Sequence, residues 1–192
     1  MNTNDPIEVK SNRALKMMLW FAMISMSMTF AGLTSAYVVS STRTDWIQQI
    51  NLPIAFTFST IVIVISSVTF HFALQQIKKG HSKNSQCLLL STLVLALSFV
   101  FFQFQGFQGI IDQGYYFTGP ESSITTSYLY VLVLLHLAHL SVGLITVLSV
   151  LFKSFKGKYV TGKTLGFELA VTFWHFLDIL WVYLYLFVSF YD

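Results

Sequence analysis

The chain has 192 residues, of which 55% are hydrophobic and 10% are charged, and its formal net charge is +3. A soluble domain carries roughly 25% charged residues, so this composition excludes a soluble enzyme and predicts a polytopic membrane protein. The lysines cluster beside apolar stretches, which points to lipid headgroups and not to nucleic acid as their partners, and the single Cys87 excludes an internal disulfide.

Five apolar stretches follow one another, and each is long enough to cross a bilayer as a helix of about 20 residues. They lack the alternating pattern of barrel strands, so we expect helices. These are predicted at about 15–41, 52–77, 85–111, 124–152 and 166–190. They occupy nearly the whole of residues 1–192, which predicts a single all-α domain, a transmembrane bundle of five helices.

The basic residues predict the orientation of the bundle. Ten of the eleven lie before or at the start of the first expected helix or in the loops after the second and fourth, and the remaining one is Arg43. Cytoplasmic segments of membrane proteins are enriched in Lys and Arg. The N-terminus is therefore expected in the cytoplasm and the C-terminus outside.

The first expected helix carries a stripe of small residues, Ser25, Thr29, Gly32 and Ala36. Small side chains let two membrane helices approach closely, so this stripe predicts a helix-packing face. The same helix holds five of the six methionines, and thioethers bind Cu(I), which raises copper transport as an alternative. The methionines are spread around the helix, however, so we interpret them as adaptable packing residues.

The fourth expected helix carries His136, His139 and Gly143 on one face. Imidazoles on facing helices hold haem or metal in membrane cytochromes, which is one interpretation of the histidines. The other is that they form hydrogen bonds between helices, because hydrocarbon offers no other partner. We favour the second interpretation because only this helix has a histidine pair.

The fifth expected helix carries the polar and aromatic residues Glu168, Trp174, His175, Asp178 and Trp181. Glu168 is expected at the cytoplasmic interface near Lys163, in a salt bridge or a headgroup contact. Asp178 follows ten residues later, roughly 15 Å deeper, where a carboxyl group needs a proton or a partner. The candidates for that partner are His175 and a polar group of a neighbouring helix, such as His139.

The segment from Trp174 to Trp181, which begins six residues after Glu168, strongly resembles the C-terminal signature of subunit III of the haem–copper cytochrome c oxidases. The residues of the fourth and first expected helices resemble that family too: His136, His139 and Gly143, and Ser25, Gly32 and Ala36. Two positions depart from its pattern. Leu137 stands where a glycine commonly follows the first histidine, and Met26 where the family commonly has a buried glutamate. The chain resembles a short five-helix version of the family.

The resemblance implies a non-catalytic subunit of a respiratory oxidase in a prokaryotic plasma membrane. Such a complex reduces dioxygen with electrons from cytochrome c and pumps protons. The family's subunit III binds neither haem nor copper, which lie in partner subunits. It packs directly against subunit I, near subunit II and small subunits, holds phospholipid in a cleft and supports proton uptake. Structural or lipid-lined packing is implied for Glu168, His175, Asp178, Trp174, Trp181, His136 and His139.

Several alternatives remain open at the level of the sequence. Within the family they are subunit III of a quinol oxidase and the related protein associated with nitric oxide reductase. From other classes they are a membrane cytochrome, which would keep haem on the isolated chain, and a small transporter, which would move solute by itself. The oxidase could also join a larger respiratory supercomplex.

Overall fold

The computed structural model describes residues 6–43, 46, 52–115, 124–157, 159 and 164–191. These residues form five α-helices and no strand: α1 (Pro6–Ser40), α2 (Ile54–Lys78), α3 (Ser82–Asp112), α4 (Ile124–Phe155) and α5 (Leu165–Tyr191). All five are long and apolar enough to cross a membrane. The predicted all-α bundle of five transmembrane helices is confirmed.

Helix α1 begins at Pro6, well before the expected start near residue 15. Proline suits the first position of a helix. The N–H group of a residue at this position has no partner within the helix, so its absence in proline costs nothing, and the backbone angle φ of proline is already helical. The helix therefore runs through the basic residues Lys10, Arg13 and Lys16 before it reaches the apolar stretch. The other helix ends lie close to the expected ones.

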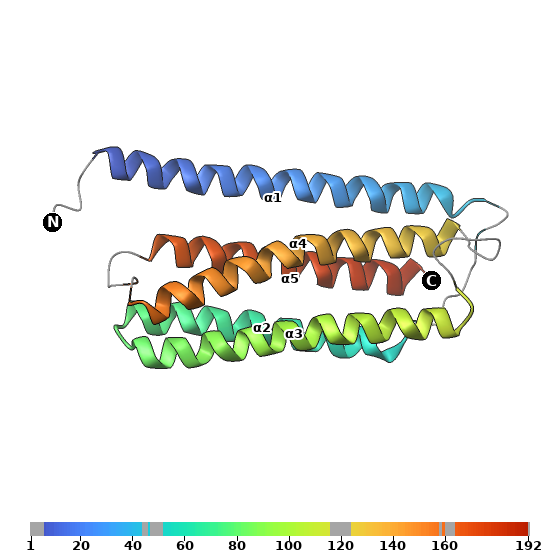
Figure 1. Cartoon of the computed structure of the whole chain (residues 1–192). Coiled ribbons are helices and arrows are strands. Elements are labelled where there is room, and N and C mark those ends of the chain that lie inside the picture. Colours follow the sequence, from blue (N-terminus) through green and yellow to red (C-terminus); the bar gives the residue numbers. More distant parts are fainter. Residues whose placement is uncertain are drawn as a thin grey trace.

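Helices α2 to α5 form a four-helix bundle, and α1 lies along one side of it (Figure 1). Helices α2 and α3 form a tight antiparallel hairpin, whose turn contains Gly80 with φ of +83°, a backbone conformation that suits glycine. Helix α5 packs against α2 and α4, and α4 also packs against α3. Helix α1 contacts only α4 and α5 among the described helices.

Helix α5 is the most deeply buried of the five. Half of the residues in an 18-residue apolar window of α5 are buried, against 17% in the corresponding window of α1. The side chains of Trp174 and Trp181 are 0% and 2% exposed. Gly143 of α4 lies against this helix, because a Cβ atom placed on it would be 2.8 Å from Leu177 Cδ1 and 3.2 Å from a ring carbon of Trp174. The glycine thus allows α4 and α5 to pack closely.

The face that α1 turns toward the bundle does not contain the small-residue stripe. The side chains that α1 buries are Met23, Phe30, Thr34 and Tyr37. Ser25, Thr29 and Gly32 are exposed, Ala36 is half-buried, and a Cβ atom on Gly32 would meet nothing within 4 Å. The stripe is therefore not a contact face within this chain. That it packs against a helix of another chain stays a prediction.

Candidate functional site

The polar and aromatic residues of α5 meet a row of hydroxyl groups on α2, and we call this contact the α2/α5 seam. Trp174 Nε1 donates a hydrogen bond to Ser66 Oγ at 3.1 Å, and Trp181 Nε1 donates one to Thr60 Oγ1 at 3.0 Å. A buried indole N–H needs such an acceptor, because hydrocarbon supplies none. The two tryptophans thus fix α5 against α2.

Helix α2 contributes hydroxyl groups that were not among the residues predicted for the site. Its hydroxyl groups also bind α3: Gln103 Nε2 donates to Ser59 Oγ at 2.9 Å, and the hydroxyls of Thr69 and Thr92 lie 2.9 Å apart. The spacing of these residues could have indicated the contact. Thr60 and Ser66 are six residues apart, and the tryptophans that they bind are seven apart. On antiparallel helices, such similar spacings of about two turns let both pairs form at once.

His175 continues the seam one residue beyond Trp174. Its Nδ1 shares a hydrogen bond with the hydroxyl of Ser67, and its ring lies 5.6 Å from the ring of His71, centre to centre. His175 is half-buried, whereas His71 is exposed on the outer face of α2. This histidine therefore serves as a hydrogen-bonding partner between helices.

Glu168 forms a salt bridge to Lys78, with Oε1 and Nζ 2.8 Å apart, and it also accepts a hydrogen bond from Thr164 at 3.2 Å. The acid lies in the first turn of α5 and the lysine in the last turn of α2, so each charge also interacts favourably with the dipole of its own helix. The expected neighbour Lys163 lies outside the described residues. Both charged groups are partly exposed, so the pair holds the helix ends in register but adds little stability.

Asp178 lies farther along the seam and is 4% exposed. Neither of its carboxyl oxygens has a hydrogen bond of ordinary geometry among the described residues, and the hydroxyl that lies beside the carboxyl group is that of Ser67. His175 is bonded to Ser67, and His139 Nδ1 is bonded to the carbonyl oxygen of Leu135 at 2.7 Å. The two histidines considered as partners of Asp178 are thus engaged elsewhere.

The two histidines of α4 point to different neighbours. His136 is fully buried between Phe99 and Trp181, with ring centres 6.3 Å and 5.1 Å away, and neither ring nitrogen has a partner in the described part of the chain. His139 packs instead against Phe30 of α1, with ring centres 5.8 Å apart. The described residues contain no group of three or more His, Cys, Asp or Glu that could hold a metal ion. The favoured interpretation of hydrogen bonds between helices therefore does not hold for these two histidines in the described residues: His139 bonds within its own helix, His136 has no bond, and both rings pack against aromatic rings.

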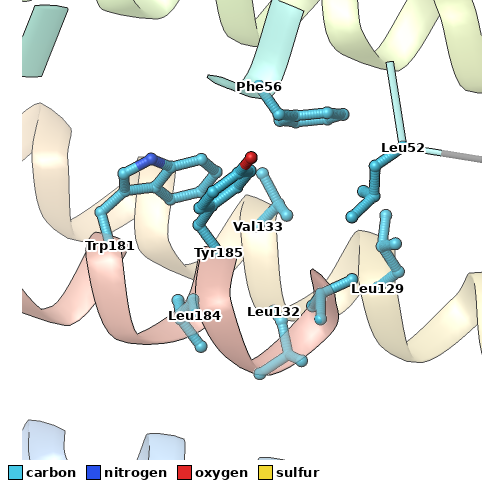
Figure 2. A pocket seen from close by; sticks show the side chains of 9 residues that line it. Leu52, Phe56, Leu129, Leu132, Val133, Trp181, Leu184 and Tyr185 are labelled. Atoms are coloured by element: carbon cyan, nitrogen blue, oxygen red, sulfur yellow. The ribbon is translucent and has the colours of Figure 1, made fainter. Parts of the chain in front are cut away.

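A small cavity of about 20 Å³ lies beside Trp181, between α2, α4 and α5. Figure 2 shows Phe56, Val133 and Trp181 around it, together with several leucines. The phenol of Tyr185 is bonded to Thr57 Oγ1 at 2.8 Å. The space is about that of one water molecule, but a water needs polar partners that this apolar lining lacks. The cavity is a packing defect and no binding site.

Comparison with known proteins agrees with the residue patterns. The model of the family described as Cytochrome c oxidase subunit III matches residues 12–192. Cytochrome c oxidase subunit 3 of Bacillus sp. (strain PS3) is 25% identical over 170 residues, 86% of this chain and 80% of that protein. Cytochrome bo(3) ubiquinol oxidase subunit 3 of Buchnera aphidicola subsp. Acyrthosiphon pisum is 26% identical over 193 residues, 98% and 92% of the two chains. Quinol oxidase subunit 3 of Bacillus subtilis is 24% identical over 192 residues, 96% and 91%.

Proposed function

This chain belongs to the cytochrome c oxidase subunit III family, and from that membership we propose that it is the non-catalytic subunit 3 of a cytochrome c oxidase. The observation that carries this proposal is the α2/α5 seam. The most distinctive residues of the family signature, Trp174, His175 and Trp181, are engaged in hydrogen bonds that join two helices. They act as structural anchors of a subunit whose redox centres belong to its partners.

In the proposed complex the chain packs directly against subunit I, which with subunit II carries the haem and copper. Cytochrome c supplies the electrons, and the chain supports proton uptake and the lasting activity of the complex. A quinol oxidase is the second candidate, because relatives named as quinol oxidase subunits match this chain about as closely as those named as cytochrome c oxidase subunits. The plasma membrane of a prokaryote is the proposed location, in line with the bacterial relatives.

The proposal is tested by purifying the tagged chain from its native membrane in mild detergent. We expect a haem spectrum and the large oxidase subunits in the product, and we expect the chain to lose all haem when it is dissociated from them. Oxygen consumption with reduced cytochrome c or with a quinol then separates the two oxidases. A colourless chain without partners would contradict the proposal, and haem retained on the isolated chain would favour a membrane cytochrome.

A phospholipid is the proposed ligand of a groove of about 430 Å³ between α1, α4 and α5. Its walls are mostly apolar, and they include Met26 at the position where the family commonly has a glutamate. Lys153 and Tyr159 line the same groove. Burial raises the pKa of the Tyr159 phenol, so this group stays neutral and can donate a hydrogen bond. An acyl chain suits the walls, and an anionic headgroup suits the lysine.

Replacing Lys153 with glutamine should lower the amount of anionic phospholipid that co-purifies with the chain by roughly fivefold, since one basic contact at a membrane surface contributes about 1 kcal/mol. Native mass spectrometry of the purified protein measures the retained lipid. Lys156→Gln is the matched control, because Lys156 is exposed and does not line the groove. Equal losses in both variants would count against a specific headgroup contact.

The proposed orientation has the N-terminus in the cytoplasm, and a labelling experiment tests it. In a Cys87→Ser background, a cysteine at His81, in the turn between α2 and α3, should react with a membrane-impermeant maleimide only after spheroplasts are opened. A cysteine at Gln113, just after α3, should react in intact spheroplasts. Both positions are exposed, so the reverse pattern would mean the opposite orientation.

A further inference from the structure

A groove of about 220 Å³ opens on the outer face of the α2/α5 seam. It is lined by three aliphatic side chains and two polar ones: Val64, Ser67, Asp178, Ile179 and Val182. Val64 and Ile179 are 44% and 70% exposed, so the rim of the groove lies at the surface of the chain. At this depth in a membrane the surface faces hydrocarbon, which offers no hydrogen bond.

Asp178 lines this groove, and its buried carboxyl group has no hydrogen bond of ordinary geometry in the described part of the chain. A carboxyl group in such surroundings is costly unless a donor or an opposite charge satisfies it. The nearby Ser67 hydroxyl is shared with His175, whose ring in turn lies against His71. Ser67 is also the internal hydroxyl beside Asp178, and it can donate to at most one of the two carboxyl oxygens, so the other oxygen is left for a group from outside.

We propose that the α2/α5 groove is the docking site for a membrane-spanning helix of another subunit, which inserts a Lys or Arg side chain as the hydrogen-bond donor to Asp178. This inference rests on the proposed function, because it names the surface that holds the subunit in its complex. A space of about 10–15 Å³ is enough for one water molecule, so a groove of about 220 Å³ has room for a long basic side chain. Its aliphatic rim suits the apolar body of a helix around that side chain.

A second copy of this chain does not meet the requirement. The sequence has no Lys or Arg between Met17 and Thr42, between Trp46 and Ile77, between Asn84 and Ile111, between Ser122 and Phe152, or from Leu165 onward. Its own basic residues therefore lie near the helix ends and in the loops, far from the depth of Asp178. A lipid is also a poor occupant, because acyl chains carry no donor.

A photo-crosslinking amino acid in place of Ile179 tests the site in the whole complex. We expect it to attach to a transmembrane helix of another oxidase subunit, within about one turn of a Lys or Arg. The matched control is the same amino acid at Val94 of α3, which is 58% exposed and lies at a comparable distance from the cytoplasmic end of its helix. Cross-links from position 179 only to lipid, or only to another copy of this chain, would overturn the proposal.

The side chain itself is tested with Asp178→Leu and Asp178→Asn. We expect Asp178→Leu to speed the loss of the chain from the purified complex by at least about tenfold, because the basic group of the partner is left buried and unpaired. Asp178→Asn keeps one acceptor oxygen and should fall between it and the unchanged protein. The isolated Asp178→Leu chain should be about as stable as the original, because the internal hydroxyl beside Asp178, that of Ser67, keeps His175 as a partner.

The outcomes separate this inference from the proposed function. If the unchanged chain brings down no oxidase subunit, the proposed function fails. If it does, and Asp178→Leu weakens the isolated chain while leaving its retention in the complex unchanged, then Asp178 serves the fold of this chain alone and the docking proposal is wrong. Loss of retention with an intact isolated chain supports it.

Discussion

Replacing Trp174 with alanine should lower the free energy of unfolding of the isolated chain by about 3–5 kcal/mol. The indole is fully buried where α4 and α5 pack closely, and its removal leaves a cavity and takes away the donor to Ser66, whose hydroxyl keeps its own bond to the carbonyl oxygen of Ile63. Denaturation of the purified chain in mixed detergent micelles measures the change. Trp174→Phe should cost less, because it keeps most of the ring volume and loses the hydrogen bond, which contributes about 1 kcal/mol.

The matched control is Trp20→Ala in α1. Trp20 is 60% exposed and leaves no cavity when it is shortened, so the free energy of unfolding should change little. Similar losses for the two alanine variants would mean that the α2/α5 seam is not the centre of the stability of this chain.

Gly143→Leu should destabilise the isolated chain by about 1–3 kcal/mol, net of the better helix propensity of leucine. Even a Cβ atom at this position would be 2.8 Å from Leu177 and 3.2 Å from Trp174, so a leucine side chain must push α4 away from α5. The same micelle denaturation measures it. Gly32→Leu is the control, because nothing lies within 4 Å of a Cβ atom there, and its effect on the isolated chain should be small.

Combining the two changes makes the test sharper. In the double variant Gly143→Leu with Trp174→Ala, the leucine can enter the space that the indole leaves. The combined loss should therefore be smaller than the sum of the single losses, by at least about 0.5 kcal/mol. Full additivity would show that the two positions do not share one packing site.

The five helices could be predicted because backbone N–H and C=O groups find no partner in lipid. A stretch of about 20 apolar residues that crosses a bilayer satisfies them by forming a helix. Rotation of each helix about its axis could not be predicted in the same way. Apolar residues cover all sides of these helices, and hydropathy does not separate the side that faces lipid from the side that faces protein. The stripe through Gly32 illustrates this, because small residues indicated a contact face and the structure turns it away from the bundle.

The partners of the polar residues show the same limit. Glu168 was expected to form a salt bridge or a headgroup contact near Lys163, and the structure pairs it with Lys78, far away in the sequence. His139 was a candidate for Asp178, yet it packs on α1. A polar residue in an apolar helix indicates the need for a partner, but the packing of helices that are distant along the chain decides which partner is within reach, and His136 finds none among the described residues. The serine and threonine residues of α2 could not be predicted as partners, because such residues in a helix commonly bond to a carbonyl group of their own helix.

The position of α1 has a consequence for how this protein is made. Helix α1 leaves the ribosome first, but it contacts only α4 and α5, and α4 begins at Ile124. At about 5–20 residues per second, the roughly eighty residues between them take on the order of 4–16 s to synthesise. During that time α1 lacks its two neighbours among the described helices, while α2 and α3 can close their hairpin as soon as both have emerged. Helix α1 is thus made before the other four helices, but its contacts within the chain form only after α4, and then α5, have been made.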